Sequence, residues 1–193
     1  MGFLPISIGV MLLFDLQIAL TRDGAVYAVL DVFPNVLGFA LILIGLIRLA
    51  RRGETCRKET ACAAFLTVVS LFVLAKDTLL YGSFYADGIE IVAGQTIGFC
   101  QHLLILGFLV LLFRRTGKAL LSLEEDRLAQ THGRVTGFAL AEGIVYVLCY
   151  ILGFVPGFPE NALSVIKLLD MLFWIALVWY GGISQLRAAL RVN

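Results

Sequence analysis

The sequence predicts an all-α integral membrane protein, a single domain in which six transmembrane helices form three consecutive hairpins. The chain has 193 residues, of which 60% are hydrophobic and 15% are charged, whereas a soluble domain is about half apolar and a quarter charged. Its apolar residues gather into runs of about 20, the length of a helix that crosses a bilayer. Because lipid cannot satisfy a free backbone amide, these runs are expected to be helices.

Basic residues separate the apolar runs and predict how the chain threads the membrane. Twelve of the 15 Lys and Arg residues fall into three stretches, one after every second apolar run. Since cytoplasmic loops carry the excess of Lys and Arg, both termini are expected in the cytoplasm. The stretches are Arg48, Arg51, Arg52, Arg57 and Lys58; Arg114, Arg115, Lys118, Arg127 and Arg134; and Arg187 and Arg191.

The expected spans, in order, are residues 3–20, 25–50, 60–81, 89–113, 135–154 and 162–183. Connections at 21–24, 82–88 and 155–161 are short and rich in Gly or Pro, so each joins the two helices of one hairpin. The first run lacks a basic leading segment and a small-residue cleavage site. It is therefore expected to stay as a helix rather than to be removed as a signal peptide.

The longest connection, about 114–134, mixes acidic and basic residues with several leucines. It is interpreted as a solvated connector between the second and third hairpins. The alternative is a short amphipathic helix over 120–128 that lies at the membrane surface.

Polar side chains inside the spans are the best indication of a functional site, since a charge at the bilayer centre costs about 2.5–3.5 kcal/mol. Given the predicted threading, most of them lie in the outer half of their spans. They predict a hydrated pocket near the outer face that binds a small polar solute. The alternative is that they are interfacial residues reaching toward the headgroups. The candidate ligand-binding residues are Asp15, Asp31, Asn35, Lys76, Asp77, Gln95, Lys167 and Asp170.

The last span shows why such groups need partners. Its large apolar residues favour insertion by about 3–6 kcal/mol in total, and two central charges would cost about 5–7 kcal/mol. Lys167 and Asp170 share a helix face, so they are expected to pair, to lie near water, or both. Elsewhere, His102 is expected to form an interhelical hydrogen bond rather than bind a ligand. Glu142 is expected in the inner half of its span, bonded to a neighbouring hydroxyl.

The second span has a distinctive face on which Asp31, Asn35, Gly38 and Gly45 recur. The two glycines allow another helix to approach closely. Pro34 removes one amide donor near the start of the span, so upstream carbonyls need other partners.

The segment Asp31-Val32-Phe33-Pro34-Asn35-Val36-Leu37-Gly38-Phe39, followed by 41–46, resembles a stretch found in an uncharacterised family of small multi-span bacterial membrane proteins. The resemblance covers mainly the first two spans, and the family often has Asp where this chain has Asn35. It implies a multi-span protein of the bacterial cytoplasmic membrane. It implies no particular activity.

The sequence contains no HExxH, GxSxG, P-loop or GxGxxG motif, and therefore favours a protein that is not an enzyme. Two histidines and four separated cysteines do not have the spacing of metal ligands, so neither a metal nor another cofactor is expected. No disulfide is expected, because two cysteines lie at a cytoplasmic boundary and two inside apolar runs. The basic residues flank membrane segments, which argues against nucleic-acid binding.

The leading hypothesis is a solute-binding or transport-related membrane protein with a polar cavity in the outer half of the bundle. The chain has no room for an ATPase, so active transport would need a partner subunit. The first alternative is a non-catalytic scaffold or interaction subunit whose basic loops bind anionic lipid or a cytoplasmic partner. The second is a membrane-embedded lipid-modifying enzyme that uses carboxylates brought together by folding.

Overall fold

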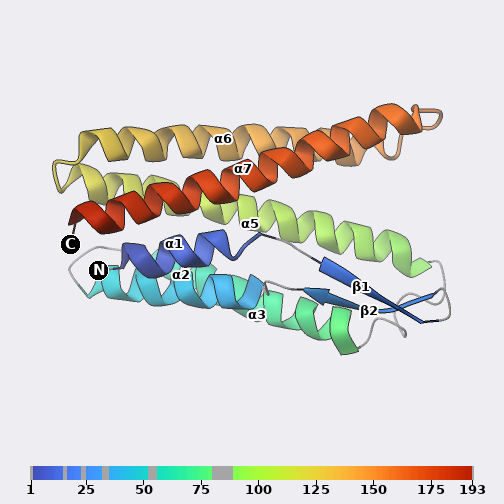
Figure 1. Cartoon of the computed structure of the whole chain (residues 1–193), viewed down its shortest axis with the longest axis horizontal. Coiled ribbons are helices and arrows are strands. Elements are labelled where there is room, and N and C mark those ends of the chain that lie inside the picture. Colours follow the sequence, from blue (N-terminus) through green and yellow to red (C-terminus); the bar gives the residue numbers. More distant parts are fainter. Residues whose placement is uncertain are drawn as a thin grey trace.

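The computed structural model describes residues 2–14, 17–22, 25–31, 35–51, 56–79 and 89–192, with side chains for 2–14, 35–51, 56–75 and 96–191. These ranges contain six helices and one two-stranded sheet (Figure 1). The elements are α1 (Phe3–Met11), β1 (Gln17–Arg22), β2 (Ala25–Asp31), α2 (Asn35–Ala50), α3 (Arg57–Leu79), α5 (Ile89–Leu121), α6 (Asp126–Leu152) and α7 (Glu160–Val192).

The helices form a ring of neighbours. Each packs on the helices that precede and follow it, and α7 returns to pack on α1, which lies between α7 and α2 (Figure 1). The contact between α3 and α5 is the sparsest, whereas α5 and α6 pack extensively. The predicted hairpins are therefore not separate units, because α5 and α6 belong to different hairpins of the prediction.

Within the described ranges, four helices are long and apolar enough to cross a membrane: 57–75, 96–121, 126–152 and 160–191. Their outward faces carry large apolar side chains, such as Phe65 at 57% and Ile144 at 64% exposure. Water-soluble monomers rarely expose extended apolar faces, whereas lipid chains cover them readily. The length and composition of these helices support a membrane protein.

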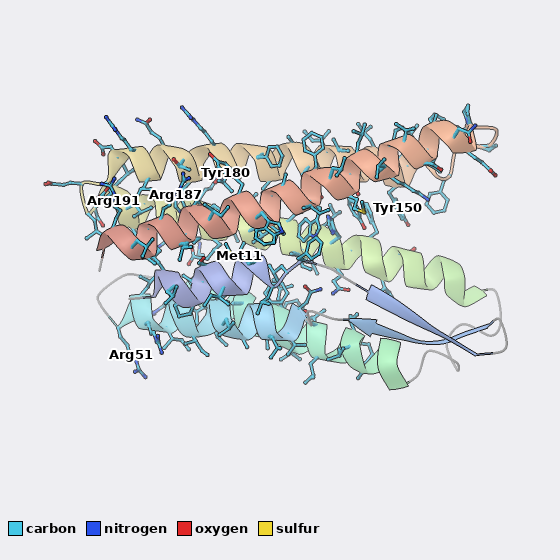
Figure 2. All side chains as sticks on the ribbon, viewed as in Figure 1. Met11, Arg51, Tyr150, Tyr180, Arg187 and Arg191 are labelled. Atoms are coloured by element: carbon cyan, nitrogen blue, oxygen red, sulfur yellow. The ribbon has the colours of Figure 1, made fainter. Side chains whose placement is uncertain are left out.

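The described residues of the three basic stretches lie at one end of the molecule. Arg51, Arg187 and Arg191 occupy this end in Figure 2. The end of α5 and the start of α6 lie there too (Figure 1), and these carry the middle basic stretch. The start of α1 and the end of α7 share this end, which is called the basic end below.

The first two predicted spans differ from the structure. The helix in the first ends at Met11, and the helix in the second begins only at Asn35. Between them, β1 and β2 pair in antiparallel fashion, with Arg22 opposite Ala25. The prediction of helix over 17–20 and 25–31 is therefore wrong.

The reason for these strands lies in the local sequence. An Asp-Gly dipeptide, which sequences favour in two-residue hairpin turns, separates residues that suit strands, among them Ile18, Thr21, Val26 and Tyr27. Hydropathy alone predicts that the same residues belong to two transmembrane helices. β2 also packs on α3, and this contact stabilises the hairpin.

The predicted connector at 114–134 is also wrong, as is the separate surface helix considered in its place. α5 continues to Leu121, α6 begins at Asp126, and a tight turn joins them in which Glu124 has φ of 59°. Leu, Ala, Lys and Arg are good helix formers. Hydropathy falls at the end of the apolar run, but nothing there interrupts the helical hydrogen bonds.

A glycine contact holds α1 against α2. A Cβ at Gly9 would lie 2.5 Å from the Gly38 carbonyl oxygen, and a Cβ at Gly38 would lie 2.8 Å from the Gly9 carbonyl oxygen. Gly45 is in a similar contact with Gly2. Larger residues cannot fit at these distances, so the predicted close approach of a helix to Gly38 and Gly45 is confirmed.

Candidate functional site

A histidine–carboxylate pair joins α5 to α6. His102 Nε2 lies 2.9 Å from Glu142 Oε1, and the Glu142 side chain is fully buried. The predicted interhelical hydrogen bond of His102 is confirmed. The predicted hydroxyl partner of Glu142 is wrong, because the partner is the His102 imidazole.

Asp170 of α7 lies at the same level as Glu142. Glu142 is ten residues before Leu152, the last residue of α6, and Asp170 is ten residues after Glu160, the first residue of α7. The placement of Glu142 in the inner half of its span stays a prediction, although Glu142 lies past the midpoint of α6 counted from the basic end. α6 begins nine residues before the predicted start at Val135, which moves its midpoint toward the basic end.

The two carboxylates keep oxygen atoms without hydrogen-bond partners. Glu142 Oε2 and Asp170 Oδ1 are both buried, and neither has a partner among the described atoms. The Asp170 carboxylate is also within electrostatic range of both Glu142 and His102. Three helices thus bring two acidic groups and one imidazole together, and this set is called the acidic cluster below.

Aromatic rings line the acidic cluster. The His102 ring lies 3.9 Å from the Tyr146 ring and 4.6 Å from the Trp174 ring, measured between centroids. Phe99 stacks on both Tyr146 and Tyr150, at 5.6 and 3.9 Å. Tyr150, labelled in Figure 2, lies on the side of the cluster away from the basic end. The His102 imidazole of the acidic cluster therefore lies among aromatic rings.

Lys167 is a basic residue close to Asp170 along α7. It is exposed, on the turn of α7 that precedes Asp170, and within electrostatic range of Cys149, as is Asp170. The predicted pairing of Lys167 with Asp170 is not present among the described ion pairs. The exposed amine can reach water, so it does not need the carboxylate.

Three predicted site residues belong to the segment from α1 to α2. Asn35 is the first residue of α2, and its buried Oδ1 has no partner among the described atoms. Asp31 is the last residue of β2, where its backbone lies opposite Gln17. Asp15 lies outside the described residues.

Three others lie near helix ends. Lys76 and Asp77 are in the last turn of α3, and Gln95 is in the second turn of α5, with backbones but not side chains described. Both helix ends point away from the basic end (Figure 1). Of the eight predicted residues, Asp170 belongs to the acidic cluster. Lys167 has an electrostatic interaction with Cys149, as Asp170 also does. A single site formed by all eight stays a prediction.

The sequence analysis left His102, Glu142, Tyr146 and Trp174 out of the candidate site. A signal was present, because Glu142, Tyr146 and Cys149 have the spacing of one helix face. The short turn between α5 and α6 makes the two helices neighbours. The lone ionisable residues in the middle of each could therefore have been paired with one another.

The cluster is better suited to an organic cation than to a metal. Among the residues that the structure describes, no group of three or more His, Cys, Asp or Glu side chains is arranged to hold a metal ion. Two carboxylates provide negative charge, and aromatic faces attract cations that are too large or too weakly hydrated for an oxygen cage. The arrangement can bind a protonated amine or a quaternary ammonium group.

Comparisons of the chain with protein-family models, with curated proteins and with solved structures give no match. The resemblance of residues 31–46 to small multi-span bacterial membrane proteins stays a prediction.

Proposed function

We propose that the protein is a solute-binding, transport-related protein of the bacterial cytoplasmic membrane, and that the acidic cluster binds a small organic cation. The basic end faces the cytoplasm in this proposal, in line with the bias of Lys and Arg toward cytoplasmic loops. A partner subunit supplies the energy if transport is active, since the chain contains no nucleotide-binding motif.

The observation that carries the proposal is the buried carboxylate of Glu142. A charged side chain inside a membrane segment is costly, and such groups mark substrate or ion pathways. His102 engages one oxygen, while Oε2 of Glu142 and Oδ1 of Asp170 stay buried without partners in the described structure. A cation between α6 and α7 would be attracted by both carboxylates.

The aromatic residues favour an organic cation over an inorganic one. Tyr146 and Trp174 flank His102 with their rings within 5 Å of it. Attraction between a cation and an aromatic face reaches about 2 kcal/mol when both are desolvated. Choline and simple primary amines match this chemistry.

The test uses Trp174 as a reporter. The chain has two tryptophans, so a Trp179→Phe background leaves Trp174 as the emitting residue next to the cluster. Choline or a primary amine is expected to change its fluorescence saturably and to raise the melting temperature of the purified protein. Neutral and anionic analogues are expected to do neither.

Matched variants locate the site. Glu142→Gln is expected to weaken choline or amine binding about 100-fold, because it removes one charge of a buried pair. Glu160→Gln, at the exposed start of α7, is the control and is expected to leave affinity unchanged. Lys167→Gln is expected to tighten binding, since it removes a nearby like charge. The proposal is abandoned if no organic cation perturbs Trp174, or if the two glutamate variants behave alike.

The His102–Glu142 pair also favours a second candidate, a membrane-embedded lipid-modifying enzyme. A histidine oriented by a carboxylate is a common general base. Incubating the reconstituted protein with lipid extracts and looking for changed lipids by mass spectrometry tests this candidate. Products that disappear with both His102→Gln and Glu142→Gln would favour the enzyme over the cation-binding protein.

A further inference from the structure

A second polar feature lies at the basic end, far along the helices from the acidic cluster. A cavity of about 420 Å³ opens between the start of α3 and the last turns of α5. This volume is in the range of small-molecule sites. The basic residues that line it are Arg57 and Lys58 from α3, and Arg114, Arg115 and Lys118 from α5.

Among the described residues that line this cavity, basic side chains outnumber acidic ones. Glu59 is the acidic residue among them, and four basic residues remain besides Arg115, which interacts with another group of the protein. Like charges around one cavity repel each other, and the cavity concentrates their field. An anion inside it would relieve this repulsion.

Helix ends do not account for all of these charges. Lys118 is in the last turn of α5, where a cation is favourable beside free carbonyl groups. Arg57 and Lys58, in contrast, begin α3, where the helix dipole disfavours cations. A general excess of basic residues on the cytoplasmic side explains their presence at this end. It does not explain why side chains from two helices line one cavity.

The wall of the cavity includes an apolar residue. Leu111, 42% exposed, lies on α5 one turn farther from the basic end than Arg114. Farther along α3, Phe65 and Phe72 present exposed rings on the apolar surface. The cavity thus lies where an apolar surface meets a basic one, at the level of lipid headgroups in a membrane-spanning bundle.

We propose that this cavity binds a phosphate-bearing anion, and that its source is the headgroup of an anionic phospholipid. Arginine and lysine donors from α3 and α5 surround the phosphate, and Leu111 lies toward the glycerol and acyl chains. Basic pockets between membrane helices suit such headgroups. The inference does not depend on the proposed function, because none of these residues belongs to the acidic cluster.

The test compares two variants of equal charge. The site variant combines Arg57→Gln, Lys58→Gln, Arg114→Gln and Lys118→Gln. The control variant combines Arg51→Gln, Arg127→Gln, Arg187→Gln and Arg191→Gln, four exposed positions that do not line the cavity. Binding of phosphatidylglycerol to the purified full chain is measured by native mass spectrometry, with phosphatidylcholine of the same acyl chains as the reference lipid.

The native chain and the control variant are expected to prefer phosphatidylglycerol, with affinities within about threefold of each other. The site variant is expected to bind it at least about tenfold more weakly. Glu59→Gln is expected to tighten binding several-fold, because it removes the opposing charge. This gain keeps the test decisive even if the site variant folds poorly.

Two soluble probes identify the source of the phosphate. Inorganic phosphate and glycerol 3-phosphate are expected to displace phosphatidylglycerol only at high concentration. Displacement at micromolar concentration, lost in the site variant, assigns the cavity to a soluble phosphate compound instead of a lipid. Equal losses in the site and control variants, or no preference for phosphatidylglycerol, overturn the proposal. Unchanged lipid binding in Glu142→Gln keeps this result separate from the fate of the cation site.

Discussion

Two buried polar clusters lie between α5, α6 and α7, and each takes one residue from each helix. The acidic cluster contains His102, Glu142 and Asp170. The second, called the neutral cluster, contains Thr116, His132 and Gln185, where Gln185 Nε2 donates to Thr116 Oγ1 at 2.8 Å. The same three helices thus carry a charged set at one level and an uncharged set nearer the basic end.

The two clusters differ in how they can satisfy their atoms. His132 Nδ1 donates to the Leu128 carbonyl at 2.8 Å, while His132 Nε2 and Gln185 Oε1 are buried without partners in the described structure. Turning the Gln185 amide by 180° would let its nitrogen donate to His132 and its oxygen accept from Thr116, whose hydroxyl would then no longer donate to the Leu112 carbonyl. No such turn helps Glu142 or Asp170, because both atoms of a carboxylate are acceptors.

The comparison separates a structural role from a functional one. Neutral polar residues between membrane helices add modest stability and fix the register of packing. Buried carboxylate oxygens that lack a hydrogen-bond donor lower the stability of the fold. Residues that lower stability in this way are expected at functional sites. The neutral cluster should therefore matter to folding and the acidic cluster to binding.

The largest expected effect on stability comes from crowding the neutral cluster. A Cβ at Gly181 would lie 2.5 Å from the Phe113 ring, whose centroid is 6.4 Å from that of His132. Gly181→Val is expected to lower the free energy of unfolding by about 1–3 kcal/mol, because the rigid ring must move. Reversible unfolding in mixed micelles measures this.

Gly107→Val is the matched control for Gly181→Val, since a Cβ at Gly107 meets no atom within 4 Å. Its effect is expected to stay within about 1 kcal/mol of the native value. Equal destabilisation by the two changes would show that helix propensity, and not the packing on Phe113, sets the effect.

The second prediction concerns coupling in the acidic cluster. A double-mutant cycle of His102→Gln and Glu142→Gln is expected to give an interaction energy of about 1–2 kcal/mol, because the two side chains share a charge-assisted hydrogen bond. A cycle of His132→Gln and Glu142→Gln is expected to be additive within about 0.5 kcal/mol. Equal coupling in both cycles would mean that the clusters act as one network.

The helices of this bundle could be predicted from hydropathy, and their ends could not. The described parts of the apolar runs at 60–81, 89–113, 135–154 and 162–183 lie in helices of the structure, except residues 153–154. Helices continue past these runs near Leu121 and Asp126, because polar helix formers carry on the backbone hydrogen bonds. Glu142 therefore lies past the midpoint of α6, whereas it precedes the midpoint of the predicted span 135–154.

The candidate site could be predicted in part for a related reason. Asp170 was predicted as a site residue because a charge within an apolar span is energetically costly. It belongs to the acidic cluster. Glu142 and His102 were each judged alone, as residues satisfied by ordinary hydrogen bonds. Their pairing depends on how α5 and α6 pack, which spacing along one chain segment does not reveal.

The third prediction separates stability from binding. Gln185→Leu is expected to lower the free energy of unfolding by about 1 kcal/mol, as an interhelical hydrogen bond is lost. Choline or amine binding, followed through Trp174, is expected to stay within twofold of native. Glu142→Gln is expected to show the reverse, with weak binding and little change in stability. Weaker binding in Gln185→Leu would contradict the division of roles.

The smallest expected effect comes from Thr116, whose hydroxyl donates to the Leu112 carbonyl at 2.9 Å and accepts from Gln185. Thr116→Val keeps the shape and removes the acceptor, so a loss of about 0.5 kcal/mol is expected. In the Gln185→Leu background the same change should cost nearly nothing, because no amide then needs an acceptor. If the loss persists in that background, the contribution of Thr116 to stability comes from its hydrogen bond to Leu112. The hydroxyl would then stabilise α5 alone, and the hydrogen bond of Gln185 would not help to hold α7 against α5.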